Sequence, residues 1–256
     1  MEEKTKPQAR TRDLGKGSIP KLLAQLAIPV VVAQIVNLLY NIVDRIYIGH
    51  IPGIGAAALT GVGLFAPLLM LINAFAMLSG SGGAPRAAIF MGKKDNETAE
   101  KIMANCFSLI LIFAVGLTVL FSIFAPKLLR LFGASDATLP YAVEYARIYI
   151  FGSIFVLIVL GMNLFITTQG FSKISMMTTL INVILDPIFI FVLDMGVRGA
   201  AIATVLSQAV GAIWVLRFLT GEKTILKLKL SNMKLDPKVF GPCLALGISS
   251  FVMIST

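Results

Sequence analysis

The chain has 256 residues, of which 57% are hydrophobic and only 14% are charged, and its mean hydropathy is +0.88. Soluble domains have a near-even apolar share and about 25% charged residues, so this composition excludes an ordinary soluble protein and predicts a multi-pass membrane protein. The net charge of +9 does not indicate nucleic-acid binding, because the basic residues lie in short segments between apolar runs and form no patch with interleaved aromatics.

Apolar runs of about 20 residues, long enough to cross a bilayer, follow a polar N-terminal tail, 1–18. Because the first run is too long for a signal-peptide core, we expect it to stay as an anchor. A further helix is expected to start within residues 239–256. The six complete expected spans are 20–48, 55–79, 103–126, 139–166, 174–194 and 199–219.

The basic residues predict the orientation of these spans. Seventeen Lys and Arg residues fall on the side of the N-terminal tail, and three, Lys127, Arg130 and Arg198, fall on the other side. The positive-inside rule therefore predicts a cytoplasmic N-terminus, and we expect the protein in the plasma or inner membrane.

The basic stretch 221–238 is the expected cytoplasmic linker between the six-span region, 19–220, and the next helix. The entry to that helix, Pro237-Lys-Val-Phe240, echoes Pro20-Lys-Leu-Leu23 at the first span. Two amphipathic span entries can look this similar without a repeat. However, six spans return the chain to the cytoplasm, so a second six-span unit would start in the same orientation, as in parallel-repeat transporters.

The two cysteines carry no motif. Cys106 and Cys243 lie inside separate apolar runs and form no CxxC pair. The sequence therefore indicates neither a metal site nor a disulfide, and we expect both to be small core residues.

Polar side chains line one face of the first span, because they recur at spacings of 3, 4 and 3 residues. Such a stripe is costly against lipid. Arg45 follows the last of these residues and points about 100° away around the helix axis. We therefore expect its side chain to turn away from the stripe or to reach the outer interface. The stripe is Gln34, Asn37, Asn41 and Asp44, with Tyr40 beside it and Pro29 as a candidate hinge.

The fifth span contains Asn182 and Asp186, which share a helix face at i, i+4. An aspartate at mid-membrane costs roughly 2.5 to 3.5 kcal/mol, so it indicates an ion, proton or substrate path. Pro187 has no N–H and should free the Val183 carbonyl and kink the helix, which makes it a second candidate hinge.

The sixth span carries Thr204, Ser207 and Gln208 on one helix face. The expected depth of these and the preceding polar residues in the membrane places them close to one another. At 1.5 Å per residue from the outer helix ends, Asp44 and Thr204 lie about 8 Å deep, Asp186 about 12 Å and Asn182 about 18 Å. An oxygen-only cluster suits a hard cation or coupled proton acceptors, and it lacks the His or Cys of a transition-metal site.

A plainer interpretation is that polar side chains join helices by hydrogen bonds worth about 0.6 kcal/mol each. That gain does not offset two buried aspartates. It accounts well for Gln34, Asn37, Asn73 and Asn163, which we interpret as packing or cavity-lining residues.

Four runs, in this order and spacing, resemble the multidrug and toxic compound extrusion (MATE) family. The resemblance covers essentially the whole chain and corresponds to the amino-terminal lobe, one half of a twelve-helix, two-lobe transporter. One departure is Gln169 before Gly170, where many relatives carry an arginine, so we give Thr167 and Thr168 no functional weight. The runs are Leu39-Tyr-Asn-Ile-Val-Asp-Arg-Ile-Tyr-Ile-Gly49, Gly80-Ser-Gly-Gly-Ala-Pro85 with Gly92, Ile181-Asn-Val-Ile-Leu-Asp-Pro-Ile-Phe189 and Gly196-Val-Arg-Gly-Ala-Ala-Ile-Ala-Thr204.

The resemblance implies an all-α lobe of six transmembrane helices, plus the start of a seventh. The protein would be an H⁺- or Na⁺-coupled multidrug antiporter that exports amphipathic, often cationic, organic compounds by alternating access, in contact with membrane lipid and with a carboxy-terminal lobe missing from this chain. The family's cation or proton site maps onto Asp44, Asn182, Asp186 and Thr204. No cofactor beyond the coupling ion is implied.

Two alternatives stay open. A flippase for a lipid-linked precursor has a related fold, and a seven-span receptor is suggested by six spans and the start of a seventh, although receptors usually have an external N-terminus. An enzyme has little support, because His50 and Glu144 are isolated. We expect Glu144 to form an interfacial ion pair with Arg147 at i, i+3.

Overall fold

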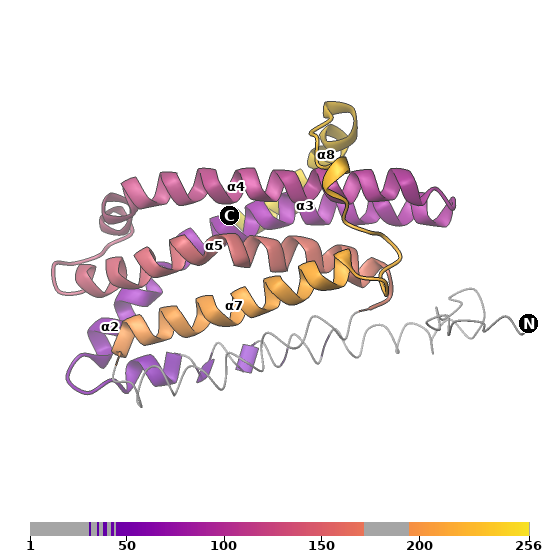
Figure 1. Ribbon diagram of the computed structural model, residues 1–256. Coiled ribbons are helices and arrows are strands. Elements are labelled where there is room, and N and C mark those ends of the chain that lie inside the picture. The colour runs from indigo at the N-terminus through magenta and orange to yellow at the C-terminus, as the bar shows by residue number, and fades with distance from the viewer. Residues whose placement is uncertain are drawn as a thin grey trace, which may run out of the picture.

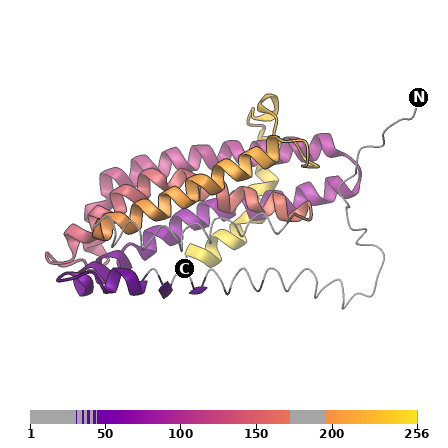
Figure 2. The same cartoon turned by 60° about the horizontal axis from the view of Figure 1, so that its bottom comes forward.

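The structure, a computed structural model, describes residues 31, 35, 38–39, 42–43, 45–171 and 195–255. Throughout this part the chain is helical, without strands, and the long helices run side by side (Figures 1 and 2). The helices are α2 (Gly55–Gly63), α3 (Ala66–Gly92), α4 (Asn96–Leu131), α5 (Leu139–Thr168), α7 (Gly196–Thr220), a 3₁₀ turn η3 (Leu230–Asn232) and α8 (Pro237–Ser255).

Within the described ranges, five helical segments are long and apolar enough to cross a membrane. Large apolar side chains on their outer faces stay exposed, such as Val115 and Ile123 on α4, and Phe151 on α5. Exposed apolar surface on this scale is what a bilayer covers. The predicted all-α, multi-pass fold is confirmed. The predicted fifth span and most of the first lie outside the described residues.

The described residues of the first predicted span also carry an apolar stripe. Val31, Ile35, Leu38, Ile42 and Ile46 are all about half exposed. Their spacing of 4, 3, 4 and 4 residues places them on one helix face. This face suits contact with lipid.

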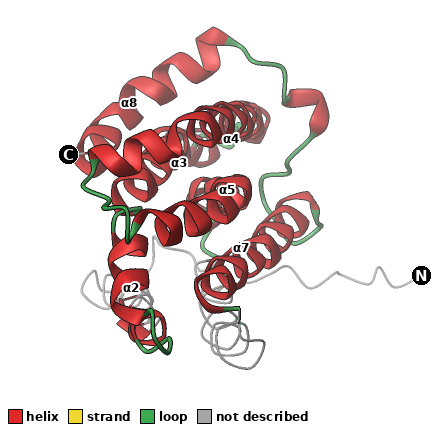
Figure 3. Cartoon of the chain, turned by 90° about the vertical axis from the view of Figure 1, so that its left-hand side faces the viewer, coloured by secondary structure: helices red, strands yellow, loops and turns green. Residues whose placement is uncertain are grey.

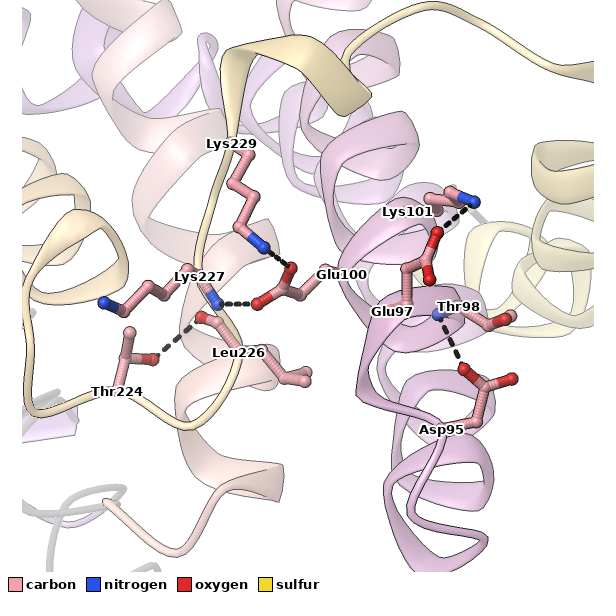
Figure 4. Close-up of polar contacts among 9 residues, drawn as sticks. All are labelled: Asp95, Glu97, Thr98, Glu100, Lys101, Thr224, Leu226, Lys227 and Lys229. Atoms are coloured by element: carbon pink, nitrogen blue, oxygen red, sulfur yellow. Dashed lines mark hydrogen bonds and ion pairs between the residues drawn. The ribbon is translucent and has the colours of Figure 1, made fainter.

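The helix ends follow local sequence signals. Asp95 caps α4 by accepting the Thr98 backbone N–H at 3.1 Å (Figure 4). Hydrogen bonds from the Thr98 side chain and backbone hold the pKa of Asp95 below its usual range. The charged cap therefore persists until the pH falls through that lowered pKa. At the end of α5, Gly170 takes the left-handed conformation (φ +88°) that glycine adopts without strain.

The glycine-rich run 80–83 corrects one prediction. The second span is expected to end at residue 79, but the run 80–83 lies inside α3, which continues to Gly92. A methyl group on Gly80 would lie 2.7 Å from the Gly161 carbonyl oxygen on α5. The glycines therefore serve close helix packing.

The bundle is built around α5, which contacts α2, α3, α4 and α7. Helix α8 packs on α3, on the side away from α5, as the end-on view shows (Figure 3). Two small residues allow this crossing, because a methyl group on Gly82 would overlap the Cys243 carbonyl and one on Gly247 would overlap the Leu78 carbonyl. The α3–α8 contact is thus a backbone-to-backbone packing.

The linker segment, residues 221–236 between α7 and α8, packs across one end of α4 and α5. The Gln169 side-chain oxygen accepts hydrogen bonds from the Thr224 hydroxyl at 2.8 Å and from the N–H groups of Ile225 and Leu226 at 2.8 and 3.0 Å. We call this end of the bundle the linker end.

On α4, the buried Glu100 accepts the Lys227 N–H at 3.0 Å and pairs with Lys229 at 2.5 Å (Figure 4). Charged and polar side chains of α4 and α5 therefore hold the linker segment by its backbone. This arrangement accounts for a glutamate and a glutamine buried at helix ends.

Candidate functional site

A cavity of about 360 Å³ lies between α2, α3, α5 and α7. Its lining runs from Tyr145 to Leu160 on α5 and includes Thr204 and Gln208 on α7, so it extends along the middle of the bundle. Its size is within the range of small-molecule sites. About half of its lining is apolar, and its polar and aromatic lining residues are Arg45, Asn73, Tyr145, Tyr149, Thr204 and Gln208.

Two tyrosines of an aromatic cluster, Tyr145 and Tyr149, form one wall of this cavity, and the buried Phe65 packs against both. The Phe65 ring stands edge-on to Tyr145 and Tyr149, with ring centroids 5.5 and 5.3 Å apart, and the two tyrosines stack at 5.9 Å. These are the favoured arrangements for aromatic quadrupoles. The tyrosines are one turn apart on α5, so the wall is rigid and pre-formed.

Helix α7 supplies two polar groups to the cavity. Thr204 is buried, and its hydroxyl donates to the Ala200 carbonyl at 3.0 Å. Gln208, one turn further along, has its side-chain oxygen buried without a hydrogen-bond partner. A buried acceptor without a partner beside a cavity is suited to a bound cation, a donor group or water.

The predicted site is described only in part. Thr204 and Gln208 line the cavity together, as their shared face predicts. Ser207 is buried and donates to Ala203 at 2.6 Å, and Asn163 has a buried, unpartnered oxygen, but neither lines this cavity. The other predicted site and hinge residues lie outside the described residues: Pro29, Gln34, Asn37, Tyr40, Asn41, Asp44, Asn182, Asp186 and Pro187.

Sequence reasoning missed part of the lining. Arg45 lines the cavity and is exposed, and whether it reaches the outer interface stays a prediction. Asn73, which the sequence favours as a packing or cavity-lining residue, lines the cavity as well. Tyr145 and Tyr149 share a helix face at i, i+4, but this spacing does not show which neighbouring helix the face meets.

The predicted Glu144–Arg147 pair is wrong. Glu144 forms its ion pair with Arg198, in the first turn of α7. Glu144 lies on the α5 face that packs against α7, and the tertiary partner therefore replaces the neighbour on the same helix.

Comparisons with known proteins agree with this fold. A sequence model of the MatE family matches residues 29–192. The multidrug export protein MepA of Staphylococcus haemolyticus is 25% identical over 243 residues, which cover 93% of this chain and 53% of MepA. The chain spans about half the length of the curated relatives it matches.

Two solved structures are similar to this chain. One is an outward-facing multidrug resistance MATE family transporter of the MOP superfamily (TM-score 0.85, 28% identity), which matches over 98% of this chain and 56% of its own. The other is an inward-facing transporter of the same description (TM-score 0.78, 30% identity), which matches over 84% and 50%.

A helical bundle whose membrane-length, apolar segments keep large apolar side chains exposed defines a polytopic membrane protein. The chain belongs to the MatE family of multidrug and toxic compound extrusion transporters. This membership sets aside the receptor alternative.

Proposed function

We propose that the protein is an H⁺- or Na⁺-coupled antiporter that exports amphipathic, often cationic, organic compounds. Residues 19–220 form its amino-terminal lobe, 221–238 join it to a second lobe, and the two lobes alternate access to the two sides of the membrane. The observation that carries this proposal is the cavity where Thr204 and Gln208 meet an aromatic wall in a MatE family lobe.

The cavity chemistry supports a bound small molecule or ion. The two tyrosine rings that line the cavity offer aromatic surface to a flat apolar group or to an organic cation. The unpartnered Gln208 oxygen and the Thr204 hydroxyl add hard oxygen ligands at one side. A cavity that offers both kinds of contact suits an amphipathic substrate.

In the proposed mechanism, Thr204 acts with Asp44, Asn182 and Asp186 as the cation or proton site. Binding of the ion shifts the first and fifth helices between two packings, with Pro29 and Pro187 as hinges. The ion and the drug compete for the same state, so each lowers the affinity of the other by the same factor. An inward ion gradient therefore drives drug outward.

The relatives support the transport cycle and the location. MepA is named a multidrug export protein, and the solved relatives are described as outward-facing and inward-facing. The orientation follows from charge: the linker end carries most of the basic residues and is proposed to face the cytoplasm, with the N-terminus on the same side.

The first test is Asp186→Asn in the full-length protein, reconstituted in proteoliposomes with an imposed ion gradient. We expect ion-driven efflux of a cationic dye to be lost while membrane insertion is unchanged. Asp136→Asn is the matched control, because the Asp136 side chain is fully exposed in a loop. Unchanged efflux in Asp186→Asn would overturn the site assignment.

Arg45 favours a second candidate, a flippase for an anionic lipid-linked precursor. Its guanidinium lines the cavity and could pair with a phosphate. The two candidates differ in the effect of Arg45→Gln. A cation exporter keeps its dye efflux, whereas a flippase loses translocation of a fluorescent lipid phosphate.

A further inference from the structure

Two cysteines 137 positions apart in the sequence meet in the structure. Cys106 on α4 and Cys243 on α8 are both fully buried, and their side chains are hydrogen-bonded to each other. The Cys243 thiol donates to the Val239 carbonyl at 3.3 Å, so its sulfur is the acceptor for the Cys106 thiol. Two thiols on different helices thus face one another directly.

Two glycines of α3 form the seat for this pair. A methyl group on Gly82 would overlap the Cys243 carbonyl, and one on Gly83 would overlap the Cys106 sulfur. The Phe165 ring closes the same seat, 2.8 Å from that position on Gly83. Close packing on these sides keeps the two sulfurs together.

A positive charge lies beside the pair. Arg86 lies one turn from Gly82 on α3, and its Nε is buried without a hydrogen-bond partner among the described residues. Cationic surroundings favour the thiolate, which is the reactive form of cysteine.

The pair also lies close to the polar layer at the linker end. The neighbouring Asn105 accepts the Asp236 N–H at 2.8 Å, and Ser108 donates to the Met233 carbonyl at 2.8 Å. Both bonds join α4 to the linker segment at the level of Cys106. This polar layer includes Asn105, the chain neighbour of Cys106, so a small, uncharged oxidant would approach the sulfurs from this side.

We propose that Cys106 and Cys243 are a redox-reactive dithiol whose oxidation to a disulfide fastens α8 to α4. The arrest of transport that would follow rests on the proposed function, since α8 begins the second lobe there. Sliding of α8 along α3 and α4 has to separate the two sulfurs, and a disulfide prevents this.

The oxidant is a peroxide. One thiolate attacks a peroxide oxygen, the O–O bond breaks, and hydroxide leaves and takes up a proton as water, which gives a sulfenic acid. The second sulfur then attacks the first, the S–O bond breaks, and a second water leaves with the remaining proton. Two thiols are oxidised to one disulfide, and the peroxide is reduced to two waters.

The test uses the full-length protein in proteoliposomes treated with hydrogen peroxide and digested for mass spectrometry. We expect a cross-linked peptide pair that joins Cys106 to Cys243, is removed by a thiol reductant and is absent in Cys106→Ser. Cys243→Ser is the second variant, should Cys106→Ser fail to fold. Recovery of the two cysteines as separate thiols or separate sulfinic acids would overturn the proposal.

Ion-driven dye efflux separates this inference from the proposed function. Peroxide should reduce wild-type efflux to background, a thiol reductant should restore it, and the serine variants should be insensitive to peroxide. A disulfide with unchanged efflux overturns the arrest. Absence of efflux before any peroxide contradicts the proposed function alone, because the cross-link is measured independently.

Discussion

At the scale of single residues, Gln169 carries an unusual share of the bonds at the linker end. Its oxygen accepts three hydrogen bonds from the linker segment, and its nitrogen donates to the Phe165 carbonyl at 3.0 Å. A buried group that loses its partner costs about 1 to 3 kcal/mol. One side chain therefore determines whether several backbone groups are satisfied.

We expect Gln169→Ala to destabilise the protein by about 2 to 3 kcal/mol, because it leaves the Ile225 and Leu226 N–H groups without acceptors. The measurement is the thermal unfolding midpoint in detergent. Thr167→Ala is the control, since the Thr167 hydroxyl is exposed and bonds only within its own helix. Equal midpoints for the two variants would show that the linker segment is not held by Gln169.

Thr204 permits a test of the ion site within the described residues. Thr204→Val keeps the shape but removes the hydroxyl, so we expect folding to be retained and the ion concentration for half-maximal efflux to rise about tenfold, the cost of one hydrogen bond or ligand. Thr204→Ser should restore the wild-type value. Thr60→Val, an exposed threonine with the same i−4 backbone bond, should change nothing.

The residues of the site could be predicted only where spacing carries the signal. Thr204 and Gln208 share a helix face, and the structure brings both to the cavity. Arg45 and the two tyrosines of α5 could not be assigned, because their role depends on which neighbouring helix each one faces. The Cys106–Cys243 contact depends on two helices far apart in the sequence, and no local sequence pattern predicts it.

At the scale of elements, the α3–α8 crossing depends on glycine. We expect Gly247→Ala to separate the helices and destabilise the protein by about 1 to 3 kcal/mol, because the new methyl group overlaps the Leu78 carbonyl. Gly241→Ala on the same helix is the matched control, since a methyl group there meets nothing within 4 Å. Thermal unfolding of both variants in detergent measures the difference.

A lower unfolding midpoint in Gly241→Ala than in Gly247→Ala would contradict this packing. The same crossing explains why the sequence predicts too short a second span. Glycine has low helix propensity, so the run 80–83 resembles a turn in sequence, and contacts with α5 and α8 outweigh that propensity. Hydrophobic length located the other described spans well, because the bilayer fixes it.

At the scale of the whole molecule, composition and hydropathy predicted the fold class, and the short motifs predicted the family. Apolar runs are a direct consequence of the lipid that surrounds the protein, so they can be recognised in the sequence without knowledge of side-chain contacts. The arrangement of helices around α5, by contrast, follows from side-chain packing between segments. The linker segment illustrates the limit: its basic charge was evident, whereas its anchoring by Glu100, Asn105 and Gln169 was not.

The central claim is that drug and ion movements are coupled in opposite directions. It is tested most directly by the reverse of ion-driven efflux: full-length protein in proteoliposomes, a dye gradient imposed without an ion gradient, and H⁺ or Na⁺ movement recorded with an ion-sensitive probe. Coupled antiport predicts that the dye moving down its gradient drives one of these ions the other way, and that Asp186→Asn abolishes this movement. Dye that crosses with no accompanying movement of either ion would contradict the account.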